Sequence, residues 1–145
     1  MKKIFLALIL GLLAIVPASA DKYLRSDEGL PQAAKSVLKK HFKSEVSLVK
    51  VDTEFAKVKE YEVIMTDGSE IKFDAQGNWK EVETRKSASV PEGFVPLAIR
   101  KYVKANHAGT HIIGIEKNRK GYEVELSNGI DMQFNKDAEF VRYDD

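Results

Sequence analysis

The sequence predicts an α+β fold built from two tandem copies of one unit, and three observations support this prediction. The segment YEVIMTDG at residues 61–68 returns as YEVELSNG at residues 122–129, 61 residues later. Each copy contains an amphipathic helical pattern introduced by a proline. Four runs typical of β-strands then follow each helical pattern. Repeats of solenoids and propellers are usually about 20–50 residues long, so a duplicated α+β unit fits this longer period better.

The first helix is predicted from Pro31 to about Phe42. Pro31 is well placed as a first helical residue because its missing N–H would be unpaired there in any case. Ala34, Val37, Leu38 and Phe42 follow at spacings that form one apolar stripe. This stripe is expected to pack against a sheet.

The second helical pattern runs from Pro91 to about Asn106. Pro96 lies inside it, and a proline in the middle of a helix removes one backbone hydrogen bond. We therefore expect a short turn first and the main helix from Pro96.

The strand-like runs have similar lengths in the two copies. Copy one has them near residues 46–52, 58–66, 69–74 and 78–83, and copy two near 110–116, 121–127, 130–135 and 139–143. The predicted organisation is therefore a first repeat at 21–83, a connector at 84–89 and a second repeat at 90–145. The two repeats are expected to form one structural domain, because each is small for an independent core.

The side chains predict the register of the central hairpin. A three-residue loop that ends at Gly68, with this glycine in a left-handed conformation, places Val63 opposite Ile71 and Tyr61 opposite Phe73. A two-residue loop would mix charged and apolar side chains on one face, because a slip of one residue exchanges the two faces of a strand. We therefore expect the three-residue loop in both copies.

The same loop rule at the next turn pairs Phe73 with Trp79 and, in copy two, Phe134 with Phe140. Ala138 stands where copy one has a glycine. A residue other than glycine resists a positive φ angle. The turn at Ala138 is therefore expected to be looser or mildly strained.

The N-terminal residues 1–20 have the features of a secretory signal peptide. Lys2 and Lys3 precede an apolar run, and Ala18-Ser19-Ala20 is a small-residue cleavage signal. The alternative is a membrane anchor, but the apolar run is shorter than the ~20 residues that a helical span needs. We therefore expect cleavage after Ala20, a periplasmic or secreted protein and no integral membrane segment after cleavage.

Charge and cysteine content restrict the partners. Without Lys2 and Lys3 the chain carries 21 basic and 22 acidic side chains, so the basic surface that nucleic acid requires is not expected. The chain has no cysteine and therefore no disulfide. The exported domain has to be stable through its hydrophobic core alone.

The two YEV segments, Leu30-Pro31, Ile71 to Asp74 and Gly77 to Trp79 resemble the PepSY-like family of secreted proteins over essentially the whole mature chain. The resemblance implies a fold similar to that of the β-lactamase inhibitory protein. Each repeat would place its helix on four antiparallel strands, and the two sheets would join edge to edge. The result would be one eight-stranded curved sheet with the helices on one face and the other face open. The family's names imply binding or inhibition of envelope enzymes, although no inhibitory residue of that protein can be matched to this chain.

We expect the open sheet face to bind an unidentified envelope or secreted protein. A few apolar side chains would lie on this face within a polar rim, as at protein interfaces. A solvated face with ordinary strand-forming residues is the alternative. The candidate residues are Glu62, Ile64, Glu70, Lys72, Lys80 and Val82 in copy one, and Glu123, Glu125, Asp131, Gln133, Val141 and Tyr143 in copy two.

A second hypothesis is a sensor for a small molecule or a cation. The ligand would occupy the cleft between the repeats or the acidic strand pair with Glu123, Glu125 and Asp131, which point to one side of the sheet. His107 and His111 have a spacing that suits zinc on a helix, but Gly109 is expected to end the helix between them. No metal or other cofactor is therefore assigned.

An enzyme is not predicted. The sequence lacks a cysteine nucleophile, a serine elbow, a phosphate-binding glycine loop and a His-Glu zinc motif. The carboxylates are expected on exposed strands, where little would raise their pKa. No catalytic residue is assigned, and an unrecognised hydrolase remains a third hypothesis.

Overall fold

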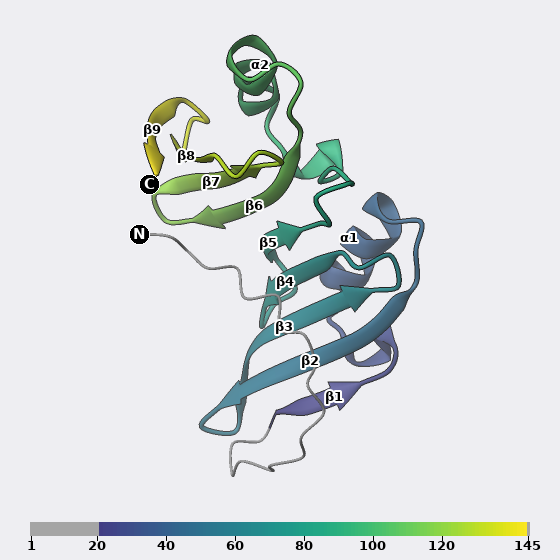
Figure 1. Ribbon diagram of the computed structural model, residues 1–145. Coiled ribbons are helices and arrows are strands. Elements are labelled where there is room, and N and C mark those ends of the chain that lie inside the picture. Colours follow the sequence, from purple (N-terminus) through teal and green to yellow (C-terminus); the bar gives the residue numbers. More distant parts are fainter. Residues whose placement is uncertain (1–20, 145) are drawn as a thin grey trace.

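The computed structural model describes residues 21–144. These residues form one antiparallel sheet of nine strands with two α-helices and two short 3₁₀ helices (Figure 1). The strands lie in the sheet in the same order as in the chain, from β1 at one edge to β9 at the other. The predicted signal peptide, residues 1–20, lies outside the described residues.

The elements follow one another with short connections. They are β1 (Lys22–Leu24), η1 (Asp27–Gly29), α1 (Gln32–His41), β2 (Val46–Glu54), β3 (Lys57–Met65), β4 (Glu70–Asp74), β5 (Trp79–Glu83), η2 (Glu92–Phe94), α2 (Leu97–Asn106), β6 (Ile112–Asn118), β7 (Gly121–Leu126), β8 (Asp131–Asn135) and β9 (Phe140–Asp144).

The predicted α+β class is confirmed, and the sheet is antiparallel throughout the described residues. One helix and four strands occur twice in the element order, as α1 with β2 to β5 and α2 with β6 to β9. The duplication itself and the boundaries at 21–83, 84–89 and 90–145 remain inferences from the sequence.

Prolines define the start of both α-helices. Pro31 immediately precedes α1, and Pro96 immediately precedes α2. The short turn predicted before Pro96 is the 3₁₀ helix η2. The rigid φ angle of proline favours a helix start, and its lack of an N–H costs nothing in the first turn.

The prediction of eight strands was one strand too low. An additional edge strand, β1, pairs with β2 and matches Lys22 to Val51 and Leu24 to Val49. This strand has only three residues, and Lys22 and Tyr23 are exposed, so it lacks the alternation of apolar and polar residues by which a strand is recognised.

The predicted hairpin registers are confirmed. Val63 lies opposite Ile71 and Tyr61 opposite Phe73, and copy two has the equivalent pairs. Gly68 and Gly129 have φ angles of 90° and 88°. These glycines permit the left-handed position that the three-residue loop requires.

The following turns also have the predicted register, with Phe73 opposite Trp79 and Phe134 opposite Phe140. The turn at Ala138 is not looser than its counterpart. The N–H of Ala138 donates to the carbonyl of Asn135 at 3.0 Å, as Gly77 does to Asp74, and Ala138 has a φ angle of 61°. The alanine therefore adopts the strained conformation without altering the turn.

One hydrophobic cluster contains side chains from both α-helices and from strands of both halves. Ala34 of α1 and Ile99 of α2 are fully buried in it, together with Val63 of β3. Their neighbours Glu62 and Ile64 on β3 are half-exposed. This alternation means that one face of the sheet carries the core, and we call the opposite face the open face.

The two halves of the sheet meet where β5 pairs with β6. The pairs are Glu81 with Glu116, Val82 with Ile115, and Glu83 with Gly114. Val82 and Ile115 are fully buried on the core face. Beyond β5, the N–H of Thr84 donates to the carbonyl of Ile113 at 2.8 Å. Backbone hydrogen bonds and apolar burial thus join the halves.

Replacement of Ala138 by glycine is expected to raise the free energy of unfolding by about 0.5–1 kcal/mol, because glycine adopts a positive φ without steric cost. Urea denaturation would measure the change.

Gly129→Ala is the matched control. Gly129 has a φ angle of 88°, and no atom lies within 4 Å of an added Cβ. Its replacement is expected to lower the free energy of unfolding by roughly 1 kcal/mol. A loss of stability in both variants would contradict the assignment of strain to Ala138.

Candidate functional site: an acidic open sheet face

Two rows of side chains cross the open face from strand to strand. Residues directly opposite each other on neighbouring strands share a face, so the register defines each row. The first row is Ile64, Glu70, Glu83, Gly114, Glu125, Asp131 and Asp144. The second row is Lys50, Glu62, Lys72, Glu81, Glu116, Glu123, Gln133 and Arg142.

Most of the sequence-predicted candidate residues lie in these rows. Those on the open face are Glu62, Ile64, Glu70, Lys72, Glu123, Glu125, Asp131 and Gln133. Lys80 also reaches this face, because its Nζ lies 3.0 Å from a carboxylate oxygen of Glu60 on β3. Val141 is 55% exposed on the edge strand β9.

The placement of Val82 on the open face was wrong. Val82 lies opposite Ile71 and is fully buried in the core. The cause is a β-bulge, since the register between β4 and β5 shifts after Phe73 and leaves Lys80 as the extra residue. Residues beyond the bulge therefore point to the face opposite to the one predicted.

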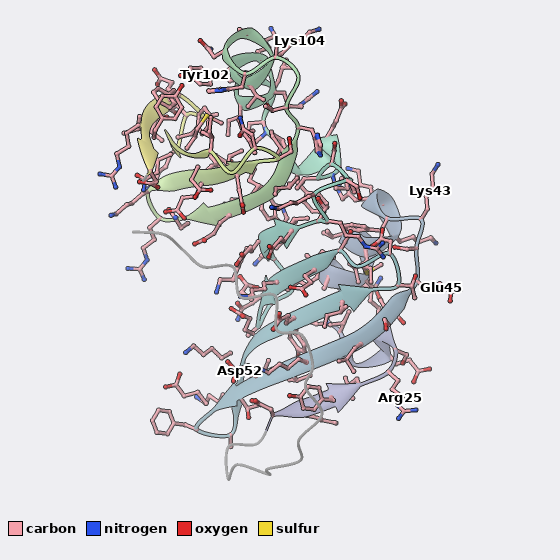
Figure 2. All side chains as sticks on the ribbon, viewed as in Figure 1. Arg25, Lys43, Glu45, Asp52, Tyr102 and Lys104 are labelled. Atoms are coloured by element: carbon pink, nitrogen blue, oxygen red, sulfur yellow. The ribbon has the colours of Figure 1, made fainter. Side chains whose placement is uncertain are left out.

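Tyr143 was misplaced for the same reason. It lies opposite the buried Met132, on the helix side of the sheet. Its hydroxyl is 3.0 Å from Nε2 of His107 and 3.4 Å from the hydroxyl of Tyr102. Tyr102 belongs to α2, and Figure 2 shows it on the side of this helix nearer β9. Tyr143 therefore belongs to an aromatic cluster that packs against α2.

Four carboxylates of the two rows were absent from the candidate list: Glu81, Glu83, Glu116 and Asp144. The spacing of the aromatic and aliphatic core residues carried the missing signal. Trp79 and Val82 are three residues apart, as are Phe140 and Tyr143, so both members of a pair can face the core only if the strand contains an extra residue.

Glu83 lies at the centre of the first row. Burial raises its pKa from 4.5 to about 7. The charges of Glu70, Glu81 and Glu125 act in the same direction, whereas Lys72 opposes them. Near neutral pH this carboxylate is therefore only partly ionised in the folded protein.

The carboxylates beside Glu83 show the same tendency. Burial and then the charge of Glu62 raise the pKa of Glu70. Burial and then the charge of Asp131 raise the pKa of Glu125. The open face thus concentrates negative charge across the junction of the two halves.

Lys72 is the main cation within these rows. Burial acts to lower its pKa, but Glu81 and two neighbouring glutamates outweigh burial and raise the pKa. Lys72 Nζ lies 3.6 Å from a carboxylate oxygen of Glu81. The lysine therefore compensates part of the negative charge, mainly on the second row.

Gly114 leaves a gap in the first row between Glu83 and Glu125. An added Cβ would lie 3.6 Å from Cβ of Glu125, which is ordinary van der Waals contact. Gly114 is nevertheless buried between the two carboxylates, and no close contact at this position requires a glycine.

The two histidines considered for zinc are separated. Helix α2 ends at Asn106, so His107 is already outside it, and Nε2 of His111 lies 2.6 Å from the carbonyl oxygen of Lys86. Within residues 21–144, no group of three or more His, Cys, Asp or Glu side chains is placed to hold a metal ion.

Two cavities lie on the helix side of the molecule. One of about 870 Å³ is lined by α1 and the start of β2, and one of about 730 Å³ is lined by α2 and residues 107–112. Neither is lined by a residue of the two rows. The open face is therefore a surface site and does not use these cavities.

No helix among the described residues is long and apolar enough to cross a membrane.

A family model described as "Putative beta-lactamase-inhibitor-like, PepSY-like" matches residues 59–142. The chain belongs to the PepSY-like family. This segment contains the junction and all of copy two's open-face candidates except Tyr143. A comparison with curated proteins found no match.

Three solved structures extend the PepSY-like similarity over most of the chain. A Bacteroides vulgatus protein described as a "putative periplasmic protein of unknown function" is 38% identical with a TM-score of 0.80, and the alignment covers 87% of this chain and 100% of the other. A second B. vulgatus protein, described as a "putative periplasmic protein", is 35% identical with a TM-score of 0.77, and the alignment covers 89% of this chain and 100% of the other. A protein from Bacteroides thetaiotaomicron, described as a "putative calcium-regulated periplasmic protein", is 38% identical with a TM-score of 0.78, covering 86% and 97%.

The stability of this PepSY-like protein is expected to rise as the pH falls from 8 to about 5. The folded pKa of Glu83, about 7, is above its ordinary value of 4.5, so the folded state binds a proton that the unfolded chain releases in this range. Glu83→Gln is expected to stabilise the protein at pH 8 by about 1 kcal/mol, a value reduced for solvent screening, and to flatten this pH dependence.

Urea titrations at several pH values would measure the effect. Glu28→Gln, at an exposed position in η1, is the control. An unchanged pH profile in the Glu83 variant would contradict the assigned cause.

Proposed function

We propose that the protein is a non-enzymatic periplasmic binding module and that its open sheet face recognises a basic surface on another envelope protein. The observation that carries this proposal is the row of carboxylates that crosses the junction of β5 and β6, with half-buried Glu83 beside Glu70. The raised pKa of Glu83 supports it. Ionised Glu83 is unfavourable in the free protein, and cationic groups of a partner would relieve this repulsion. Binding would thus gain from complementary charge.

The arrangement of the face supports a large partner. The two rows run across the strands of both halves, and few cations lie among the carboxylates. Half-exposed Ile64 and exposed Val141 add apolar surface. A polar face with a few apolar residues is typical of a protein interface.

The proposed interface keeps most of the candidate residues. It consists of Glu62, Ile64, Glu70, Lys72, Lys80, Glu123, Glu125, Asp131, Gln133 and Val141, with Glu81, Glu83, Glu116 and Asp144 added. Val82 and Tyr143 are excluded because they point to the helix side.

A raised carboxyl pKa also suits a general acid, so catalysis needs a separate argument. An active site encloses its substrate in a concave pocket, and neither of the two cavities on the helix side includes Glu83. The row lies on a sheet surface outside both cavities, which favours binding over catalysis. Whether binding inhibits an enzyme partner would be measured on the isolated complex.

The periplasmic location rests on two supports. The descriptions of the three relatives with 35–38% identity all include the words "putative" and "periplasmic protein". The N-terminal sequence has the features of a signal peptide with cleavage after Ala20.

Capture from a Bacteroides envelope extract would test the proposal. The mature protein is expected to retain a basic protein that is released near 0.5 M salt, where the screening length is about 4 Å. Glu83→Lys/Glu125→Lys is expected to weaken binding of the purified partner by roughly tenfold or more.

Glu28→Lys/Glu139→Lys is the matched control, because it changes the net charge equally at exposed positions outside the two rows. An equal loss of affinity in both variants would mean that binding depends only on the net charge of the protein. Equal retention by all three proteins would refute a role for the open face.

A second candidate function is a response to calcium. The description of the B. thetaiotaomicron relative favours it, and carboxylates are the ligands that calcium prefers. Because the described residues contain no preformed metal cluster, calcium would act by neutralising the carboxylate rows and would compete with the basic partner.

Millimolar calcium is then expected to raise the melting temperature at pH 8 more than magnesium at equal ionic strength. The shift should vanish with a chelator and decrease in Glu83→Gln/Glu125→Gln. A calcium shift of the same size in this variant would place the ion elsewhere on the molecule.

A further inference from the structure

The β2–β3 hairpin extends beyond both neighbouring strands. The last pair between β1 and β2 is Lys22 with Val51, and the last pair between β3 and β4 is Glu60 with Asp74. Residues 52–59 therefore form a two-stranded arm, and Figure 1 shows its tip projecting from the sheet. Asp52, labelled in Figure 2, lies near the base of this arm.

The tip of the arm has an unusual turn. Phe55 and Ala56 connect Glu54 to Lys57, and they have φ angles of 52° and 60°. Such two-residue turns strongly favour Asn-Gly, because both residues are left-handed. The chain therefore accepts backbone strain at two successive residues other than glycine.

Folding does not account for the phenylalanine at this position. The side chain of Phe55 is 92% exposed, the highest value among the exposed large hydrophobic residues. A ring in this position adds almost no buried area, and asparagine would fit the turn better. Its presence points to a contact outside the chain.

We propose that Phe55 is an apolar anchor that enters a pocket on the protein partner bound by the open face. This inference rests on the proposed function. Aromatic anchors buried in a partner's pocket dominate the energetics of many interfaces. The arm is paired on both sides of a β-bulge at Lys59, and such a paired arm presents the ring with little loss of conformational entropy.

A membrane is the competing target for an exposed phenylalanine. Burial of one ring favours insertion by only roughly ten- to a hundredfold, which is weak for a stable membrane anchor. The arm has no net charge that would strengthen binding to a charged membrane, because Lys57 and Lys59 are balanced by Asp52 and Glu54. Lys59 Nζ lies 3.3 Å from a carboxylate oxygen of Glu54. A protein pocket is therefore the favoured target, since the rest of the interface supplies the remaining affinity.

The decisive variant is Phe55→Asn/Ala56→Gly, which installs the preferred turn. Its melting temperature is expected to rise by roughly 3–5 °C because backbone strain is relieved. Its affinity for the purified partner is expected to fall by roughly tenfold or more. A role of Phe55 in folding would instead lower the melting temperature. Phe55→Trp is the conservative control and is expected to retain most of the affinity.

The partner is identified by photo-crosslinking in the envelope extract, with a benzophenone amino acid at position 55 or, as the control, at exposed Lys40 on α1. A protein cross-linked only from position 55, which loses affinity for the Asn-Gly variant when purified, supports the anchor. Absence of such a protein overturns it, as does binding to phosphatidylglycerol vesicles that requires Phe55.

The two proposals fail in distinguishable ways. A partner that loses affinity for Glu83→Lys/Glu125→Lys but binds the Asn-Gly variant normally overturns the anchor and leaves the open face supported. A partner that loses affinity for the Asn-Gly variant but binds Glu83→Lys/Glu125→Lys normally overturns the proposed function. This result would support the arm as a separate binding element.

Discussion

The pairing of β5 with β6 is the constraint on which the rest of the structure depends. Val82 and Ile115 are buried on one side of this junction, and Glu81 faces Glu116 on the other. Like charges directly opposite each other destabilise a strand pair. Lys72 beside Glu81 offsets part of this repulsion. Apolar burial and backbone hydrogen bonds stabilise the junction against the remainder.

Glycine positions and apolar spacing made most of the fold predictable. Gly68 and Gly129 define the loop length, and the loop length decides which residues oppose each other, so the pairs Val63–Ile71 and Val124–Met132 followed from the sequence. Strand β1 could not be predicted in this way. Its residues gain their conformation from pairing with β2, and no local pattern marks that pairing.

The candidate site was only partly predictable, because its composition depends on two β-bulges. An extra residue at Lys80 reverses the direction of everything after it in β5, which exchanges Val82 for Glu81 and Glu83 on the open face. The raised pKa of Glu83 could also be found only from the three-dimensional structure. The residues that raise its pKa come from β4, β5 and β7, and only the completed sheet brings them together. Sequence alone predicted ordinary, exposed carboxylates.

The single tryptophan provides a natural optical probe of how the two halves dock. Trp79 belongs to β5, but its ring meets Phe94 edge-on at 5.3 Å and lies 5.5 Å below Nζ of Lys117, and both of these residues come from the second half. Separation of the halves would expose the indole to water and remove a nearby cation. Fluorescence emission from Trp79 would therefore report whether the junction of β5 and β6 is intact, without any added label.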